Sequence, residues 1–210
     1  MKKLGLYTLC LIALCACTPD ANHEKFTQGM NAYLAKRGDL CLAKYNWPID
    51  VTPAEFAAGA RNAVQMPVLQ KLGLVAVSEV SVETKTDNAV VATKVKRYQL
   101  TESGKKHYLI RELRTLASGG SKTLHQGDFC VAKLSLDKIV AWDPPTNDSA
   151  RKETVVTYTY TVEAAPWLQD PDAKRVFPMV DRVVQGARVA QLQEAFALTK
   201  DGWVAKDLLD

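Results

Sequence analysis

Histidine is scarce in this sequence, and its apolar runs are short. His23, His107 and His125 are the three histidines, and each stands alone among charged or polar neighbours, so we expect all three to face solvent. The apolar run over residues 4–16 has 13 residues, whereas a helix that crosses the hydrocarbon core of a membrane needs about 20. We therefore expect no membrane-spanning helix there.

The motifs that mark common active sites are also missing. The sequence has no GxSxG around a nucleophilic serine, no HExxH for zinc, no phosphate-binding glycine loop and no acidic pair spaced for general acid–base work. Zinc needs about four ligands, and neither Cys41 nor Cys130 has a second ligand at a suitable spacing. We expect no metal, no cofactor and no catalytic residue, although residues distant in sequence could still form an active site.

The N-terminus carries an export signal. Two lysines precede residues 4–16, a run whose length is typical of the apolar part of a secretory signal peptide. The motif Leu14-Cys15-Ala16-Cys17 then resembles the lipobox of bacterial lipoprotein precursors. In that family the signal is cleaved before the cysteine, which is acylated with fatty acids such as palmitate. The resemblance implies a signal peptide over 1–16 and lipidation of Cys17; the alternative is an ordinary signal peptide with incidental cysteines.

The residues after Cys17 indicate where the lipoprotein would go. Thr18 stands where a retention signal for the inner membrane usually has Asp, so the resemblance implies transport to the outer membrane. Residues 17–24 form a short polar tether that would keep the folded part close to the bilayer, facing the periplasm. Loss of the two signal lysines lowers the formal net charge from +4 to +2.

Cys41 and Cys130 are the cysteines that remain after the signal peptide and Cys17 are set aside. They lie in a near-repeat, GDLCLAK at 38–44 and GDFCVAK at 127–133, which we interpret as a Gly-Asp turn that enters a strand, used twice. In an oxidising compartment such a pair is most simply a disulfide, and closing a loop of about 90 residues stabilises a chain by roughly 4 to 5 kcal/mol. Two separate buried thiols, or a catalytic Cys130 with His125 as its base, are the alternatives.

We expect an α+β fold in one large domain or two small units. The Gly/Ser-rich stretch at 116–122 is the expected boundary. A helical, winged-helix-like unit is expected over 25–116, and an antiparallel β-sheet unit with one helix is expected over 123–210.

Residues 55–108 resemble a winged-helix domain. VLQKLGLVAV and VKRYQLTESGKKHY carry the likeness: in that family a helix ending in Leu-Gly-Leu leads into a two-stranded wing, and the returning strand ends in Leu-Thr-x-x-Gly at a short helix. In a cytoplasmic winged helix a basic wing would contact phosphates. Here we expect no nucleic acid, because export removes the chain from the chromosome and the base-reading helix offers only Gln65, Gln70 and Lys71.

Local signals place the helices of the first half. Apolar spacing predicts a helix over 23–37 that ends at Gly38. Thr52, followed by a proline, is an N-cap and predicts a helix through Ala63. Pro67 should kink that helix or begin a second one.

Local signals also place the elements of the second half. Alternating apolar residues predict long antiparallel strands over 128–142 and 151–167. Asp170 as N-cap predicts a helix that Pro178 disturbs. Residues 189–199 fit a helix by composition, but the Asp-Gly turn that follows favours a strand in a hairpin.

Positive charge gathers between residues 94 and 114, where the net charge is +5. Two glutamates, Glu102 and Glu112, stand there against seven cations: Lys94, Lys96, Arg97, Lys105, Lys106, Arg111 and Arg114. In the proposed wing they could bind an anionic surface, such as acidic lipid, lipopolysaccharide, peptidoglycan or an acidic protein. The alternative is a solvated face without a partner.

Three tryptophans stand beside prolines at the expected ends of elements. Trp47, Trp142 and Trp167 on rigid turns could line a groove for a glycan or peptide. The alternative is that they fill the ends of the sheet and the seam between the two units.

These observations favour an outer-membrane-anchored periplasmic lipoprotein that binds or supports other envelope components and is not a catalyst. Its expected partners are the membrane, through the N-terminal lipid, and an envelope protein, peptidoglycan or lipopolysaccharide. A cell-envelope hydrolase with a dispersed active site is the alternative, and a DNA-binding regulator is a third hypothesis.

Overall fold

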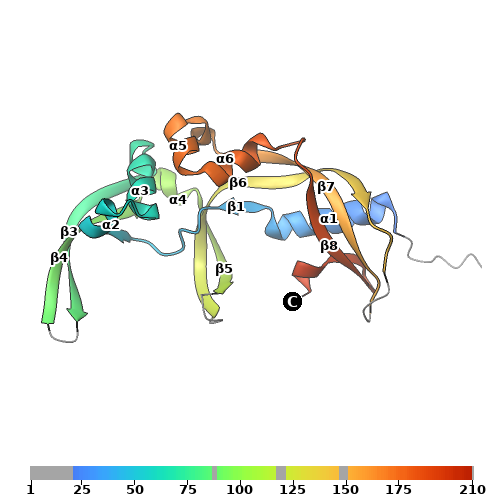
Figure 1. The fold of residues 1–210 in the computed structure, drawn as a ribbon, viewed down its shortest axis with the longest axis horizontal. Helices are drawn as coiled ribbons and strands as arrows, with labels where there is room; N and C mark the ends of the chain where they lie inside the picture. The colour runs from blue at the N-terminus through green and yellow to red at the C-terminus, as the bar shows by residue number, and fades with distance from the viewer. Residues whose placement is uncertain (1–20, 87–88, 117–121, 147–150, 210) are drawn as a thin grey trace, which may run out of the picture.

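The computed structural model describes residues 21–86, 89–116, 122–146 and 151–209. The signal peptide, Cys17 and the tether residues through Asp20 lie outside the described residues, so what the sequence indicates for them stays a prediction. Figure 1 shows an elongated, arched molecule with hairpin β3–β4 at one end, a strongly curled sheet at the other, and hairpin β5–β6 projecting between them. The strands pair antiparallel, so the expected α+β class is confirmed.

The described elements, in chain order, are α1 (His23–Arg37), β1 (Asp39–Cys41), β2 (Ile49–Val51), α2 (Pro53–Ala57), α3 (Arg61–Lys71), β3 (Val75–Thr86), β4 (Ala89–Leu100), α4 (Glu102–Lys105), β5 (Tyr108–Leu116), β6 (Lys122–Trp142), β7 (Glu153–Ala164), the 3-10 turn η1 (Pro166–Gln169), α5 (Pro171–Val176), α6 (Pro178–Gln185), β8 (Leu192–Thr199), β9 (Gly202–Ala205) and the 3-10 turn η2 (Lys206–Leu208). No helix within these described stretches combines the length and the apolar character needed to cross a bilayer.

A three-stranded sheet in the order β2-β4-β3 forms one end of the arch, with α2 and α3 beside it. The Thr52 hydroxyl accepts a bond from the backbone N–H of Glu55, whose carboxylate accepts one from Thr52, so both ends of this capping box are in place. The predicted continuation to Ala63 is wrong. Helix α2 ends at Ala57 because the chain reverses at Gly59, whose φ of +61° suits glycine. Pro67 lies inside α3 on its exposed side, where the missing bond can be replaced by water.

The second sheet runs in the order β1-β6-β7-β8-β9, with β5 paired to β6 as well. The first half of the 21-residue strand β6 pairs with β5 and the second half pairs with β7. The sheet curls around α1, whose buried face of Phe26, Met30 and Leu34 packs with Val156, Phe196 and other strand residues. The helix predicted at 23–37 is confirmed, and its buried face packs on strands from the C-terminal half of the chain.

Two hydrophobic clusters hold the arch together. The first unites Met66 and Leu69 of α3 with Tyr98 of β4, and it also takes in Phe129 of β6 and Val176 of α5. The second is the core between α1 and the curled sheet. The first cluster thus draws residues from both of the expected units. Of the expected boundary at 116–122, residues 117–121 lie outside the described residues, and the strands on either side of it, β5 and β6, pair with each other.

Several local predictions for the second half are confirmed. Asp170 caps α5, because its carboxylate accepts bonds from two backbone N–H groups of the first turn, and Pro178 separates α5 from α6. The segment at 192–199 is a strand, and it pairs with β9 across the Asp201-Gly202 turn. The winged-helix likeness of residues 55–108 stays a prediction. Helix α1, which precedes β2 in the chain, packs on the sheet that contains β7 and β8 and not on the three-stranded sheet.

The Cys41–Cys130 disulfide is present, and the two cysteines are opposite each other where β1 pairs with β6. The first Gly-Asp pair marks the step from α1 to β1, as expected. The second does not form a turn, because Gly127 lies within β6. A Cβ at Gly127 would sit 2.7 Å from the carbonyl oxygen of Leu109, so glycine there allows β5 to approach closely.

Candidate anion-binding site

The structure neutralises part of the predicted basic stretch. The guanidinium of Arg97 donates to both carboxylate oxygens of Asp50, at 2.7 and 2.6 Å. Arg111 Nη1 lies 2.6 Å from a carboxylate oxygen of Asp39, and Lys105 pairs with Glu102 three residues before it. These three cations are therefore engaged within the chain.

The other four members of the basic stretch separate. The side chain of Arg114 lies outside the description, although its backbone pairs with Leu124. Lys106 lines a pocket beside Cys130. Lys94 and Lys96 come together two residues apart on one face of β4, both exposed, and no ion pair joins them to a carboxylate among the described side chains.

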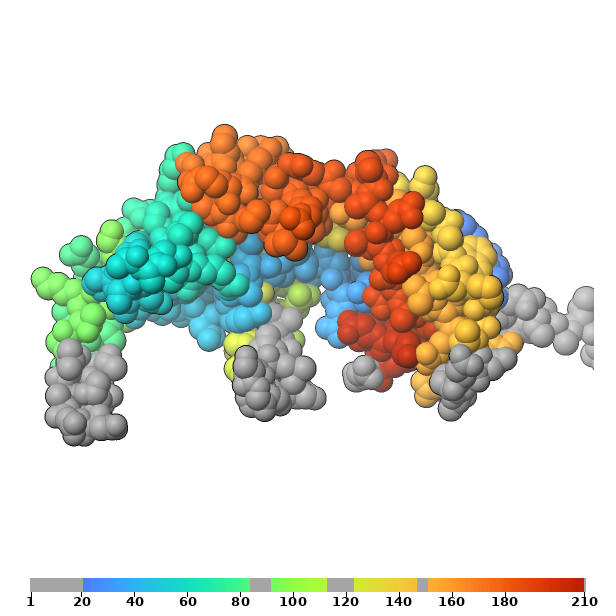
Figure 2. Space-filling model, viewed as in Figure 1, coloured from blue at the N-terminus to red at the C-terminus, as the bar shows by residue number. Residues whose placement is uncertain are grey.

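Lys94 and Lys96 border a pocket of about 350 Å³ between β4 and α2, which we call the wing-base pocket. Its apolar wall is formed by Val51, Pro53, Phe56 and Val95, and Glu79 also lines it. Lys96 Nζ lies 5.1 Å from the centre of the Phe56 ring, a cation–π distance. In Figure 2 this part of the molecule is the cyan and green end of the arch.

Local structure holds the wing-base pocket in place. The capping box fixes the start of α2 and so positions Phe56 in its first turn. The Arg97–Asp50 pair clamps β2 to β4 directly beside Lys96, and the hydrogen bond from Arg97 keeps the pKa of Asp50 below its usual range. Glu79 is the residue opposite Lys96 on β3. Lys94 and Lys96 together outnumber Glu79, so the polar lining of the wing-base pocket carries a net positive charge beside its apolar wall.

The three predicted groove tryptophans are not brought together. Trp47 and Trp167 pack against the first hydrophobic cluster, where Trp47 lies near Phe129 and Trp167 near Phe177. Trp142 packs in the second cluster, with its ring 5.2 Å from that of Phe26. Packing within the clusters, the alternative to a groove, accounts for the contacts of all three.

The prediction that the histidines face solvent is wrong for two of them. His125 is 8% exposed and its ring stacks on Tyr45 at 4.0 Å. His107 is half-buried; its ring accepts a hydrogen bond from the indole N–H of Trp167, and burial lowers the pKa of His107. For His125 the polar neighbours were misleading because strand residues alternate between faces, so a polar flank does not imply an exposed side chain. His107 lies in the turn before β5, where the rings of Phe129 and Trp167 pack against it.

Sequence reasoning missed a buried lysine at the centre of the arch. Lys44 is 2% exposed, and its Nζ donates to the amide oxygens of Asn62 and Gln65, each at 2.7 Å. Burial, with Arg61 nearby, lowers the pKa of Lys44 to about 8. Lys44 occupies the same place in its heptapeptide as the half-exposed Lys133, so no sequence signal distinguishes them.

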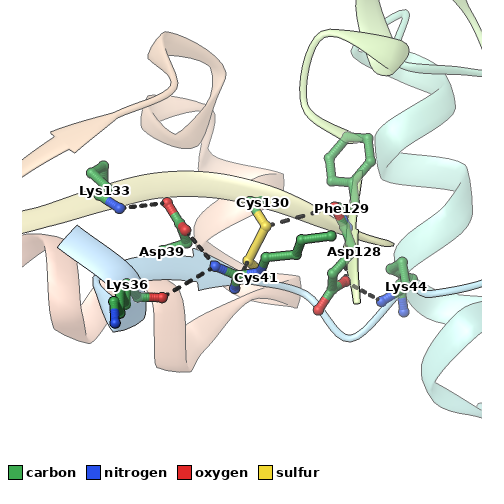
Figure 3. The surroundings of a disulfide bond; sticks show 9 residues. Lys36, Asp39, Cys41, Lys44, Asp128, Phe129, Cys130 and Lys133 are labelled. Atoms are coloured by element: carbon green, nitrogen blue, oxygen red, sulfur yellow. Dashed lines mark hydrogen bonds and ion pairs between the residues drawn. A yellow bond between two sulfur atoms is a disulfide. The ribbon is translucent and has the colours of Figure 1, made fainter. Parts of the chain in front are cut away.

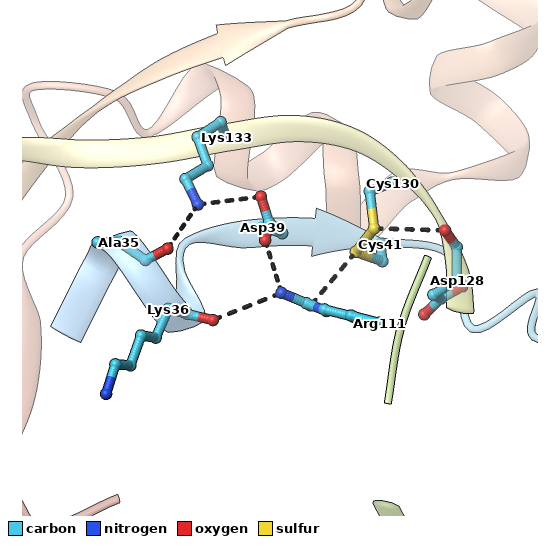
Figure 4. A network of polar contacts seen from close by, with 8 residues as sticks. All are labelled: Ala35, Lys36, Asp39, Cys41, Arg111, Asp128, Cys130 and Lys133. Atoms are coloured by element: carbon cyan, nitrogen blue, oxygen red, sulfur yellow. Dashed lines mark hydrogen bonds and ion pairs between the residues drawn. A yellow bond between two sulfur atoms is a disulfide. The ribbon is translucent and has the colours of Figure 1, made fainter. Parts of the chain in front are cut away.

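The two aspartates of the near-repeat also differ. Asp128 is buried, and its carboxylate accepts bonds from the backbone N–H groups of Lys44 and Phe129, each at 2.7 Å (Figure 3). Burial raises the pKa of Asp128 in spite of these bonds. Asp39 instead joins Arg111 and Lys133 by ion pairs (Figure 4). Asp39 thus links β1 to β5 and β6, and Asp128 links the residues that follow β1 to β6.

Among the residues that the structure describes, no group of three or more His, Cys, Asp or Glu side chains gathers in a way that could hold a metal ion. The wing-base pocket combines an apolar wall, an aromatic ring and two lysines, which suits a ligand that is both apolar and anionic. Comparisons with protein-family models, with curated proteins and with solved structures find no match to this chain.

Proposed function

We propose that this chain is a lipoprotein anchored in the outer membrane, facing the periplasm, that binds an anionic envelope component at the wing-base pocket and does not catalyse a reaction. The anchor rests on the sequence around Cys17, and the ligand class rests on the pocket. An acidic lipid or another anionic amphiphile fits best, since its apolar part can contact Val51 and Phe56 while its charged group approaches Lys94 and Lys96.

The observation that carries this proposal is the pairing of charges around β4. Arg97 of β4 is neutralised by Asp50 of the neighbouring strand β2, whereas Lys94 and Lys96 line the pocket. A charge used inside the fold serves stability, and a charge left at the edge of an apolar pocket is available to a ligand. This selects two cations out of the broader basic stretch.

The winged-helix likeness enters the same proposal. The strand order β2-β4-β3 with α2 and α3 ahead of the hairpin, and the short helix α4 after Leu100-Thr101, support it. We propose that this unit is a winged-helix-like module used for binding in the envelope instead of for reading DNA.

The proposal is tested with a soluble chain that begins at residue 18 and with vesicles of phosphatidylcholine, with or without phosphatidylglycerol. We expect binding only to the anionic vesicles, and weaker binding at high salt. The variant Lys94→Gln/Lys96→Gln should bind about tenfold more weakly or worse, because each lysine near an anionic surface contributes about 1 kcal/mol.

Lys105→Gln/Lys106→Gln is the control, because it removes the same formal charge from α4 and its C-cap, which follow β4 in the chain and do not line the pocket. It should weaken binding less than the pocket variant. Phe56→Ala should also weaken binding, although it changes no charge. Equal losses in the two lysine variants, with no effect of Phe56→Ala, would show that only overall charge matters and that the pocket is not the site.

A further inference from the structure

The Cys41–Cys130 disulfide lies between two pockets. Cys130 lines one of about 480 Å³, together with His107 and Pro166, and Cys41 lines another of about 270 Å³, beside Ala43. Both cysteines are partly exposed. A small thiol or the tip of a protein loop can therefore approach this disulfide from outside.

The two sulfur atoms have different electrostatic surroundings. Arg111 Nη2 lies 4.0 Å from Cys41 Sγ, and the Nε of the same guanidinium is buried and has no hydrogen-bond acceptor in the described part of the chain (Figure 4). Cys130 Sγ instead lies 3.6 Å from the carbonyl oxygen of Asp128. A thiolate at Cys41 would meet a cation with an unused N–H, whereas a thiolate at Cys130 would meet a carbonyl dipole.

The charged groups around Arg111 do not cancel this asymmetry. Asp39 binds Nη1 of Arg111, and it also accepts an ion pair from Lys133 at 3.1 Å. The backbone carbonyl of Lys36 is a second, weaker acceptor at 3.4 Å from Nη1. Asp128 is a second carboxylate close enough to interact electrostatically with Arg111. Its hydrogen bonds and those of Asp39 do not use Arg111 Nη2, the nitrogen that faces Cys41 Sγ. The guanidinium would therefore stabilise a thiolate at Cys41 more than one at Cys130.

We propose that Cys41–Cys130 is a thiol–disulfide exchange site for a dithiol reductant, in which Cys130 is the sulfur attacked and Cys41 is the leaving thiolate. The attacking thiolate forms a mixed disulfide with Cys130 Sγ as the Sγ–Sγ bond breaks, and its electron pair leaves on Cys41 beside Arg111. The second thiol of the reductant then attacks the reductant's own sulfur in the mixed disulfide, and the bond to Cys130 Sγ breaks. The reductant becomes a disulfide, and Cys130 takes up the proton released.

Exchange at this position would act on the link between the two hydrophobic clusters. Helix α1 packs in the second cluster, and Leu42 belongs to the first. The short segment from Gly38 to Leu42 therefore runs from one cluster to the other. The disulfide fixes this segment to β6. A reductant that opens the disulfide would loosen the connection between the ends of the arch without removing either core.

The test uses the chain that begins at residue 18, because Cys41 and Cys130 are then its only cysteines and all described elements begin later. The protein is treated with glutathione, the freed thiol is alkylated at low pH, and the modified peptides are identified by mass spectrometry. We expect glutathione on Cys130 and the alkyl group on Cys41. The reverse pattern would overturn the assignment of the leaving sulfur.

The rate of reduction by dithiothreitol gives a second measurement. Arg111→Gln should slow it about threefold to tenfold, because the leaving thiolate loses its cation and a thiol of higher pKa leaves more slowly. Arg111→Lys keeps the charge and should stay close to wild type. Arg97→Gln also breaks an arginine–aspartate pair, far from the sulfurs, and is the matched control.

The sign of the change separates exchange from a purely structural bond. If the disulfide only staples the fold, removing Arg111 destabilises its surroundings and reduction becomes faster or stays the same; either result overturns the proposal. In the reduced protein, the alkylation rate of Cys41 as a function of pH should give a thiol pKa below the ordinary value of about 8.5, and Arg111→Gln should raise it. A Cys41 pKa at or above the ordinary value would also overturn the proposal.

Discussion

The buried Lys44 makes the stability of this protein depend on alkaline pH in a way that can be calculated. In the folded chain its pKa is lowered from 10.5 to about 8 by burial and by Arg61. A shift of that size corresponds to about 3 kcal/mol between the two protonation states. Below pH 8 the folded protein holds this cost in full, because Lys44 is charged inside the core.

The sign follows from which state binds more protons. Between pH 8 and 10.5 the unfolded chain keeps the Lys44 proton while the folded chain releases it, so the contribution of this group to stability rises with pH. Tyrosines act in the opposite direction: burial raises the folded pKa of Tyr158 to about 12 and that of Tyr33 further. The unfolded chain then loses tyrosine protons first, so their contribution falls above about pH 10.

The variant Lys44→Met isolates the lysine, since the tyrosines are the same in both proteins. We expect the unfolding free energy of wild type minus that of Lys44→Met to rise by about 3 kcal/mol between pH 7.5 and 10.5. The difference in unfolding free energy at neutral pH is a poor test, because two effects of the substitution oppose each other. The variant removes a buried charge, which stabilises the fold. It also leaves the amide oxygens of Asn62 and Gln65 without a donor, which costs about 1 to 3 kcal/mol each.

The measurement is urea unfolding of both proteins over this pH range, with Lys138→Met, the loss of an exposed lysine, as the baseline. Arg61→Gln should shift the rise to higher pH, because the neighbouring cation that lowers the Lys44 pKa is gone. A difference that stays flat from pH 7.5 to 10.5 would refute the reasoning, since Lys44 would then titrate alike in both states.

Three further predictions concern the fold and the anchor. Gly104→Ala should lower the unfolding free energy by about 2 to 3 kcal/mol, because the new Cβ would lie 1.9 Å from the carbonyl oxygen of Leu74. Gly59→Ala, the control, places its Cβ near no other atom and should cost only about 1 kcal/mol of left-handed backbone strain. Equal losses in the two variants, measured by urea unfolding, would argue against the contact with Leu74. Replacing both Cys41 and Cys130 by serine should cost about 4 kcal/mol in the same assay, and an unchanged midpoint would contradict a stabilising disulfide. Cys17→Ala should leave unprocessed precursor in cells, as seen by intact mass; a fully processed soluble chain from that variant would end the lipoprotein hypothesis.

The sequence by itself determined the features that depend on neighbouring residues. The end of α1 at Gly38, the caps at Thr52 and Asp170, and the break at Pro178 all follow from backbone hydrogen bonds and φ angles within a few positions of the residue that causes them. Alternation of apolar residues was enough to predict β7, and the hypothesis of export, with two remaining cysteines, was enough to predict their disulfide.

Only the tertiary structure decided which of several similar residues are used. Arg97 and Arg111 are neutralised by aspartates 47 and 72 positions away, while Lys94 and Lys96 remain over a pocket whose wall comes from another strand and a helix. Lys44 and Lys133 share one heptapeptide context, yet one is buried and the other pairs at the surface. Such differences depend on strand register and on which face meets a core, and both are set by residues far along the chain.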